Sequence, residues 1–255
     1  MQQFKKRLKH YQVALLMAML VCVSFAFIRP NAAANFNKTI VASAHTVTNA
    51  AKSFVEEKIG LYDSLGLEAK GLSRQAFEYA LAGYNKLLGE GKLQNNNMLS
   101  ILDFSLSSAK KRLFVIDITT GELVFNTYAA HGRGSGTAMA TEFSNTPNSF
   151  KSSLGFYVTG ETYSGKHGES LRLNGEEEGF NDNALARGIV MHSAAYVGED
   201  IASKQGYIGR SQGCPAVPEE MSKEIISKIK NGSCLFLYSP DKNYTAHSKL
   251  LNDNI

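Results

Sequence analysis

A cysteine and a histidine in the second half of the chain are of the types that nucleophilic catalysis uses. Cys214 lies among small turn-forming residues in the run GRSQGCPAVP, and His192 ends the apolar run GIVMH. A thiol attacks an acyl carbon only as a thiolate, so it needs a base or a cation nearby. If a strand carries the imidazole to a sheet edge where the turn presents the sulfur, the pair predicts acyl transfer through a thioester.

The residues next to this pair indicate how it would be completed. Gly213 lets the backbone approach closely, so we expect the N–H groups of Gly213 and Cys214 to bind the developing oxyanion. No Asp or Asn is singled out by position to orient His192, and the backbone carbonyl of Ser193 is the alternative. From spacing alone, a lone Cys and a lone His are more often core residues than a catalytic pair.

Other polar residues have both a functional and a structural interpretation. Arg187 and Arg210 flank the two candidate segments and could hold a substrate carboxylate bidentately, or pair with the acidic run at 176–178. His131 and His167, each beside a glycine, are interpreted as loop residues or substrate contacts rather than acid–base groups. Tyr163 and Tyr196 are interpreted as residues that either line the groove or simply pack.

Phosphate and metal sites are weaker hypotheses. The run HGRGSG at 131–136 lacks both the Gly-Lys-Ser/Thr ending and a following helix, so we interpret it as a wall of a cleft. Zinc would need His131, His167, His192 or Cys214, and their spacing contains no short pair such as His-x-x-x-His. The sequence therefore implies no metal and no cofactor.

The first 34 residues have the pattern of an export signal. A basic segment at 1–10 precedes an apolar run at 11–28, and Ala32–Ala34 form a small-residue cleavage site. We expect cleavage after Ala34 and localisation in the periplasm or cell envelope. The alternative is an uncleaved anchor, because 18 apolar residues lie at the lower limit for spanning a bilayer.

The charge balance excludes one class of partner. Without residues 1–34, the chain has 22 basic and 23 acidic residues, a net charge of −1. No basic run remains that would follow a phosphate backbone, so nucleic acid is not expected as a partner.

Export also bears on the cysteines, because an oxidising compartment tends to pair thiols. A disulfide between Cys214 and Cys234 is one interpretation. However, Cys234 lies in the apolar run GSCLFLYS, where it is expected to pack as a small hydrophobe. The redox state and the oligomeric state stay open.

The predicted secondary structure that must position these residues changes from helix to short strands near residue 99. Apolar residues recur at helical spacing between a capping Ser73 and a stop at Gly89, which predicts an amphipathic helix. We predict a helical arm and linker over 35–98, followed by a catalytic domain over 99–245.

Short strands make up most of this second region. The run RLFVIDITTGELVFNTYA predicts a hairpin around TTGE, and LGFYVTG, SLRL, RGIVMH and CLFLYS predict further strands. One helix, PEEMSKEIISKIKNG, interrupts them and ends at Asn231-Gly232. The pattern favours a mainly β (α+β) fold, an antiparallel sheet, sandwich or barrel rather than βαβ units.

The two candidate catalytic segments, RGIVMHSAAYVG and IGRSQGCPAVP, also resemble a known family. Together with TYSGKHGESLRLNGEEEGFNDNA and DFSLSSAKKRLFVIDITTGELVFNTYAAHGRGSG before them, they resemble the murein L,D-transpeptidase catalytic domain, the YkuD-like family, over roughly residues 70–240. The resemblance implies an exported cysteine acyltransferase with a mostly β fold, acting on peptidoglycan stem peptides.

The resemblance also implies roles for individual residues. It makes Cys214 the nucleophile, His192 the base, Ser193 the orienting carbonyl, and Gly213 with Cys214 the oxyanion hole. The residues expected to contact substrate are Ser211, Gln212, Arg210, His131 and Tyr163.

The chain departs from the family pattern on the acceptor side, which leaves alternatives open. Gln212 replaces the usual motif histidine, and Pro215 follows the cysteine. The alternatives are an L,D-carboxypeptidase, another cysteine peptidase with the same pair, and a noncatalytic cell-wall-binding protein. Contact with a membrane is expected only through an uncleaved leader.

Overall fold

The computed structural model describes residues 54–166 and 168–252, and the predicted signal peptide lies outside them. All the described residues belong to one compact unit, Ala50–Ile255. Within these ranges no helix is both long enough and apolar enough to cross a bilayer.

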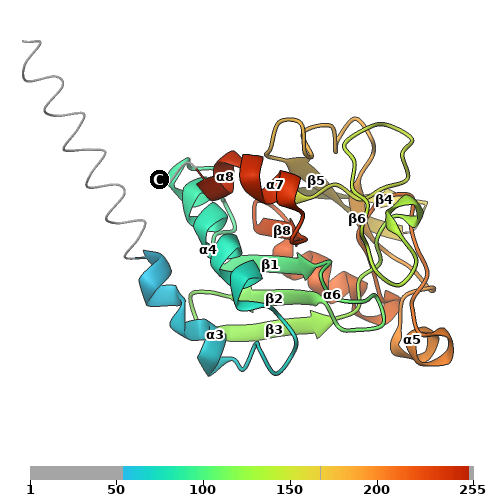
Figure 1. Cartoon of the computed structure of the whole chain (residues 1–255), viewed down its shortest axis with the longest axis horizontal. Helices are drawn as coiled ribbons and strands as arrows, with labels where there is room; N and C mark the ends of the chain where they lie inside the picture. The colour runs from blue at the N-terminus through green and yellow to red at the C-terminus, as the bar shows by residue number, and fades with distance from the viewer. Residues whose placement is uncertain (1–53, 167, 253–255) are drawn as a thin grey trace, which may run out of the picture. The chain divides into compact units, whose positions relative to one another are not determined.

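Eight strands form one sheet in the order β3-β2-β1-β8-β4-β5-β6-β7 (Figure 1), which confirms the mainly β fold class. The strands are β1 (Met98–Asp103), β2 (Leu113–Asp117), β3 (Glu122–Thr127), β4 (Gly155–Gly165), β5 (Gly168–Gly175), β6 (Val190–Ser193), β7 (Ala216–Val217) and β8 (Cys234–Tyr238). β2 and β3 pair antiparallel, as the hairpin prediction requires.

The prediction of an antiparallel sheet is wrong at two pairings. β1 pairs with β8 in parallel, and β6 pairs with β7 in parallel. Alternation along a strand identifies its buried face but not the direction of its neighbour, which depends on connections between distant segments. β7 itself has only two residues between Pro215 and Pro218, too few for a pattern.

The two edges of the sheet approach each other and nearly close it into a barrel. After β3 the chain continues to Ala130, whose N–H donates to the carbonyl of Ala216 at 2.8 Å. A second bridge joins Gly132 to Ser211. The closing seam therefore runs through the segment that contains Cys214.

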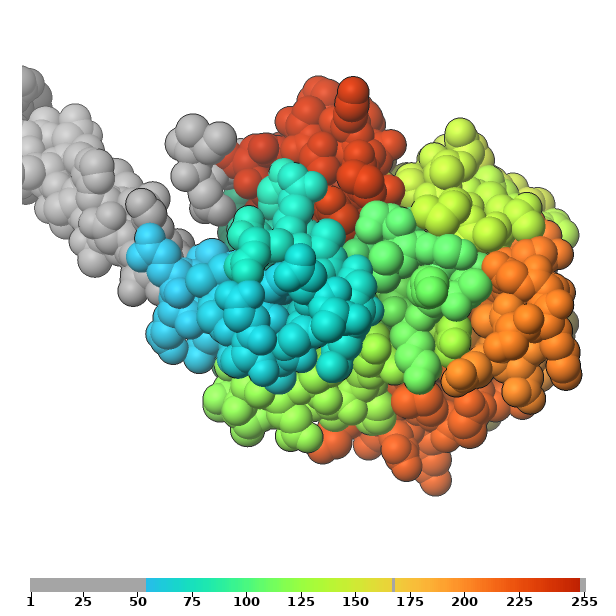
Figure 2. Space-filling model, turned by 60° about the horizontal axis from the view of Figure 1, so that its bottom comes forward, coloured from blue at the N-terminus to red at the C-terminus, as the bar shows by residue number. Residues whose placement is uncertain are grey.

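The predicted helix in the N-terminal arm is confirmed at both ends. α4 (Arg74–Gly89) follows the short helix α3 (Gly60–Ser64), and Ser73 Oγ accepts a hydrogen bond from the N–H of Ala76. The apolar side chains of α4 belong to the same core as those of the sheet. In Figure 2 the α4 segment (cyan) lies against the C-terminal segment (red) on the surface of this unit.

The remaining helices are short, and one of them was predicted. α6 (Glu219–Ile229) is confirmed and buries Ile225, Ile226 and Ile229. The others are η1 (Arg133–Ser135), α5 (Glu199–Gln205), α7 (Lys242–His247) and α8 (Lys249–Asn252). α5 lies at one end of the unit, away from α4 (Figure 1), and a small apolar cluster of its own surrounds Ala202.

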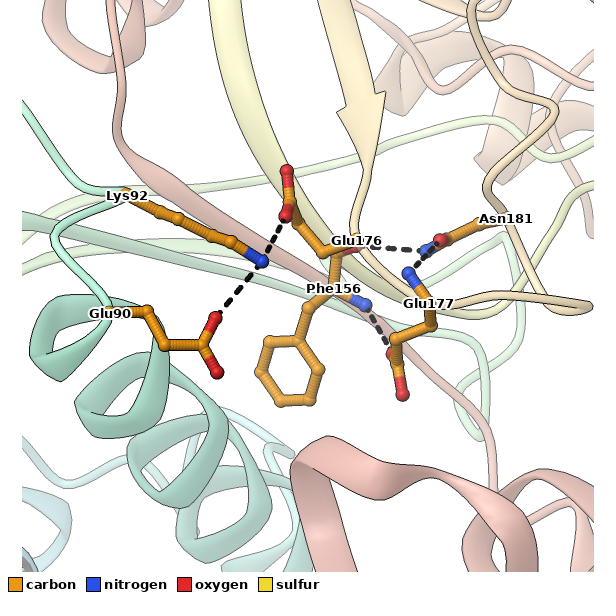
Figure 3. Close-up of polar contacts among 6 residues, drawn as sticks. All are labelled: Glu90, Lys92, Phe156, Glu176, Glu177 and Asn181. Carbon is orange, nitrogen blue, oxygen red and sulfur yellow. Dashed lines mark hydrogen bonds and ion pairs between the residues drawn. The ribbon is translucent and has the colours of Figure 1, made fainter. Parts of the chain in front are cut away.

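Polar contacts anchor the loop that leads from β5 to β6 (Figure 3). Lys92 Nζ lies 2.9 Å from carboxylate oxygens of both Glu90 and Glu176. Glu177 Oε2 accepts from the N–H of Phe156 at 2.8 Å, and Asn181 Nδ2 donates to the carbonyl of Phe156 at 2.9 Å. This loop is therefore fixed to α4 and β4 before it reaches the strand that contains His192.

Candidate active site

A cavity of about 530 Å³ brings most of the predicted site residues together. Both Cys214 and His192 line it. Its lining residues are Arg133, Asn148, Phe150, Tyr163, Lys166, Ser170, Arg187, Gly188, Ile189, Val190, His192, Tyr196, Arg210, Ser211, Gln212 and Cys214. His167 lies outside the described residues.

The parallel pairing of β6 with β7 brings the segments of Cys214 and His192 to the same cavity. His192 is in register with Ala216, and its N–H donates to the carbonyl of Pro215 at 3.3 Å. Cys214 precedes Ala216 by two residues and lies in the bend 212–214 that leads into β7. The pairing therefore holds the bend beside His192, and both side chains line the cavity.

The imidazole of His192 is held in the tautomer that a base requires. Its Nδ1 lies 2.8 Å from the backbone carbonyl of Ser193. A carbonyl oxygen only accepts, so Nδ1 carries the proton, and Nε2 of the neutral ring has the lone pair.

The sulfur of Cys214 is half-buried and protonated in the resting site. Burial raises the pKa of the Cys214 thiol, while hydrogen bonds from the backbone N–H groups of Val190 and Cys214 and the charge of Arg187 oppose the increase. Sγ lies 3.7 Å from the carbonyl of Gly188, to which a thiol can donate. For this sulfur to act as a nucleophile, a base would have to take the proton.

Ser211 closes the turn that presents the sulfur. Its hydroxyl donates to the carbonyl of Cys214 at 2.6 Å and accepts from the N–H of Gly213 at 3.0 Å. The predicted oxyanion hole needs a correction here, because the N–H of Gly213 is already bonded. The N–H of Cys214, which contacts its own sulfur in the resting site, is the other predicted backbone donor. Ser211 is buried, so its main role in this structure is to shape the turn.

His131 is a structural residue rather than a substrate contact, which corrects its predicted role. It is fully buried and does not line the cavity. Arg112 Nη2 donates to its Nδ1 at 2.7 Å, and its Nε2 donates to the carbonyl of Gly136 at 3.2 Å. Burial, followed by the charge of Arg112, lowers the pKa of His131 from 6.5 to about 4, so the ring is neutral. Its own carbonyl accepts from the N–H of Ser211 at 3.0 Å and so supports the catalytic turn.

Arg112 is a residue that sequence reasoning missed. It is fully buried, and its guanidinium also donates to the carbonyls of Ala129 and Leu106, both at 3.0 Å. In the sequence it follows two lysines at the edge of a predicted strand, a context that is typical of solvent-exposed residues. No signal in that pattern distinguishes it from Lys110 or Lys111.

The cavity lining is positively charged. Four of its residues are cationic and none is acidic; the cations are Arg133, Lys166, Arg187 and Arg210. Arg210 is exposed and donates to the carbonyl of Gly136 at 3.1 Å. Arg133 lies 4.0 Å from the ring centroid of Phe150. Both are exposed on the lining, where a guanidinium group could hold an anionic group bidentately.

The alternative that Arg187 pairs with the acidic run at 176–178 is wrong. Its guanidinium donates to oxygens of the 144–153 segment. Within the acidic run, Glu176 pairs with Lys92, and Glu177 accepts from Ser248.

The glycine-rich run at 131–136 forms part of the cavity wall, as interpreted from the sequence. The N–H of Gly132 donates to Ser152 Oγ at 3.0 Å, and the N–H of Gly134 donates to the carbonyl of Phe150 at 2.8 Å. In the described part of the chain, no three His, Cys, Asp or Glu side chains gather as ligands of a metal ion would. Cys214 and Cys234 are both free thiols, and Cys234 is buried in β8.

Comparison with known proteins supports the similarity found at the level of motifs. Residues 68–238 match the profile of a family, YkuD_2, described as the L,D-transpeptidase catalytic domain. No curated protein matches the sequence.

Similar solved structures include proteins of several bacteria. An L,D-transpeptidase from Mycobacterium smegmatis aligns at 13% identity and a TM-score of 0.36, covering 56% of this chain and 59% of that one. An L,D-transpeptidase from Stackebrandtia nassauensis aligns at 14% identity and a TM-score of 0.35, covering 65% of this chain and 67% of that one. The helical cell shape determining protein Pgp2 of Campylobacter jejuni aligns at 12% identity and a TM-score of 0.36, covering 63% of this chain and 57% of that one. The chain thus spans about three fifths of the first of these proteins.

Proposed function

Because the chain belongs to the L,D-transpeptidase catalytic domain family, we propose that it is an exported cysteine acyltransferase that acts on peptidoglycan stem peptides. The observation that carries the proposal is the pairing of β6 with β7, which sets Cys214 and an oriented His192 on one wall of a cationic cavity. The family supports a role in peptidoglycan modification, and the cysteine mechanism is our inference from this geometry.

In the first half-reaction His192 Nε2 takes the proton of the Cys214 thiol as Sγ attacks the carbonyl carbon that precedes the terminal D-alanine. The carbonyl electrons move to oxygen, and the N–H of Cys214 stabilises the oxyanion. When the C–N bond breaks, His192 returns the proton to the leaving amine. The products are D-alanine and a thioester on Cys214.

In the second half-reaction an amine of a neighbouring stem peptide attacks the thioester and restores the free thiol. His192 accepts a proton from the attacking amine, and the thiolate leaves and is reprotonated. If water attacks instead, the same intermediate gives an L,D-carboxypeptidase. The two activities share every residue named above and differ only in which nucleophile reaches the thioester.

The charge of the cavity supports an anionic donor. The donor ends in a carboxylate, and the exposed Arg210 and Arg133 are the guanidinium groups best placed to bind it, since Arg187 is half-buried and donates to four protein oxygens. Tyr163 and Gln212, both exposed on the lining, remain candidates for contacts along the peptide.

The decisive experiment is exchange of the terminal residue. The full chain is incubated with a tetrapeptide stem ending in D-alanine and an excess of another D-amino acid, and products are followed by mass spectrometry. We expect exchange, loss of exchange in Cys214→Ala, and a trapped adduct of the wild type that lacks D-alanine. Release of D-alanine without exchange would show a carboxypeptidase.

Two outcomes would contradict the proposal. Cleavage of all-L peptides would identify a general cysteine peptidase. Binding to peptidoglycan that is equal in wild type and Cys214→Ala, with no turnover in either, would identify a noncatalytic cell-wall protein. Export is tested separately by the N-terminal sequence of the protein recovered from the cell envelope, which we expect to begin after Ala34.

A further inference from the structure

Arg187 is bound more tightly to the protein than any other cation of the cavity. It precedes β6 and is half-buried. Its Nη1 donates to the carbonyl of Ser144 at 2.8 Å and to Ser153 Oγ, and its Nη2 donates to the carbonyl of Lys151 at 2.7 Å. A weaker contact of 3.3 Å joins Nη2 to Ser149 Oγ. All these acceptors lie in one segment, 144–153.

The charge of this guanidinium is not neutralised by a carboxylate. Its hydrogen-bond acceptors are carbonyl and hydroxyl oxygens, and no ion pair of Arg187 occurs among residues 54–166 and 168–252. The groups whose charge acts on it are Tyr157 and Cys214. An arginine stays protonated in proteins, so a full positive charge lies inside the wall of the cavity.

The same guanidinium lies close to the turn that contains Cys214. A Cβ placed on Gly213 would lie 3.4 Å from Arg187 Nη2 and 2.9 Å from the carbonyl of Lys151. Gly213 immediately precedes Cys214. The bond from Nη2 to the carbonyl of Lys151 therefore lies next to the residue before Cys214.

The other cations of the lining are placed differently. Arg133 and Arg210 are exposed, and water and salt screen exposed charges strongly. Among the four cations of the lining, Arg187 is the one whose charge lowers the pKa of the Cys214 thiol. A half-buried charge at short range is screened much less and favours the anionic form of a nearby acid.

We propose that Arg187 is a positioning residue for acyl transfer, whose buried charge favours the Cys214 thiolate while its hydrogen bonds hold the 144–153 segment against the catalytic turn. The inference rests on the proposed function in taking Cys214 as the nucleophile. It replaces the earlier hypothesis that Arg187 binds a substrate carboxylate.

The test measures thiolate formation without any substrate. The full chain reacts with iodoacetamide between pH 6.5 and 9.5, and alkylation of the peptide that contains Cys214 is followed by mass spectrometry, so that Cys22 and Cys234 do not contribute. The reagent is neutral, so the cationic lining does not attract it. A tenfold loss of thiolate is partly offset by higher intrinsic nucleophilicity and slows the reaction about threefold.

The variants separate charge from packing. We expect Arg187→Gln to slow alkylation at pH 7.5 by about three- to tenfold, the effect of a neighbouring charge that shifts a pKa by one to two units. Arg187→Lys and Ser153→Ala keep the charge and are expected to stay within about twofold of wild type. Arg133→Gln, which removes an exposed cation from the same cavity, is expected to do the same.

Two results would overturn the inference. One is an unchanged rate in Arg187→Gln, and the other is an equal loss in Arg133→Gln, which would assign the effect to the cavity as a whole. If circular dichroism shows that Arg187→Gln does not fold, the alkylation rate of Arg187→Lys is used instead. Lysine keeps the positive charge, so a rate more than about tenfold below wild type in Arg187→Lys contradicts a role for charge. Since alkylation needs no turnover, a negative exchange assay would refute the proposed function and leave this result standing.

Discussion

At the scale of the residue, the catalytic turn depends on a conformation that only glycine adopts easily. Gly213 has a φ of +127°, and a Cβ there would also lie 2.9 Å from the carbonyl of Lys151. The left-handed region costs an L-residue about 1–2 kcal/mol, and a contact with fixed backbone adds to that. The turn that presents Cys214 therefore tolerates no side chain at this position.

We predict that Gly213→Ala destabilises the protein by about 2–4 kcal/mol and reduces turnover at least about tenfold, since the thiol is displaced from His192. Urea denaturation and the exchange assay measure the two effects. Gly206→Ala is the matched control, because Gly206 also has a positive φ (+79°) but no atom within 4 Å of a Cβ. It should lose only about 1–2 kcal/mol and keep its activity. Equal losses in both variants would contradict the role given to the contact.

At the scale of the element, α4 packs closely enough on the sheet to exclude a methyl group. A Cβ on Gly83 would lie 2.1 Å from the ring of Phe156 in β4. The sequence predicted this helix from its spacing, its Ser73 cap and its stop at Gly89, because all three are local signals. Which glycine faces an aromatic ring depends on a strand some 70 residues away, and no local pattern records that.

We therefore predict opposite effects for two glycines of one helix. Gly83→Ala should destabilise the fold by about 1–3 kcal/mol through overpacking, although alanine favours a helix by up to about 1 kcal/mol. Gly89→Ala, with nothing within 4 Å of its Cβ, should be neutral or slightly stabilising. Chemical denaturation of both variants measures the difference. A gain of stability in Gly83→Ala would show that α4 moves away from Phe156 at little cost.

At the scale of the whole molecule, buried ionisable groups couple the stability of the fold to pH in opposite directions. The pKa of His131 is lowered to about 4, so its contribution is present above pH 6.5 and is lost as the pH falls towards 4. Burial raises the pKa of Asp103 and of Glu177, so their contributions are present at low pH and are lost as the pH rises.

We predict that His131→Gln flattens the fall of stability between pH 6.5 and about 4. Glutamine can still accept from Arg112 and donate to Gly136 but takes up no proton in this range. Between pH 6.5 and pH 4, the free energy of unfolding should fall by up to about 3 kcal/mol less in the variant than in wild type. Each tenfold change in proton affinity contributes about 1.4 kcal/mol to this difference. Urea denaturation at constant ionic strength measures both curves. If the stability curves of wild type and variant are parallel, folding does not lower the pKa of His131 and the prediction is wrong.

The same scale shows what the sequence could and could not predict. Strand runs, the hairpin, the helices α4 and α6 and the placement of Cys214 and His192 on one cavity follow from local patterns and from family motifs. The parallel pairings, the burial of Arg112 and the bond that occupies the N–H of Gly213 depend on segments far apart in the chain. Residue type alone does not distinguish a histidine such as His131, which supports a turn, from one that binds a substrate.

The segment between His192 and Cys214 packs around Ala202 in a small apolar cluster that lies apart from the main core, and Tyr128, Ala130 and Ala216 also contribute to this cluster. Both ends of the segment are tied by backbone pairing, so the base and the nucleophile keep their register whatever lies between them. Insertions, deletions and substitutions in this segment are thus tolerated more readily than changes in β6 or the turn. Substitutions at Tyr196 and Arg210 in this segment would change the cavity lining without changing the pairing of β6 with β7.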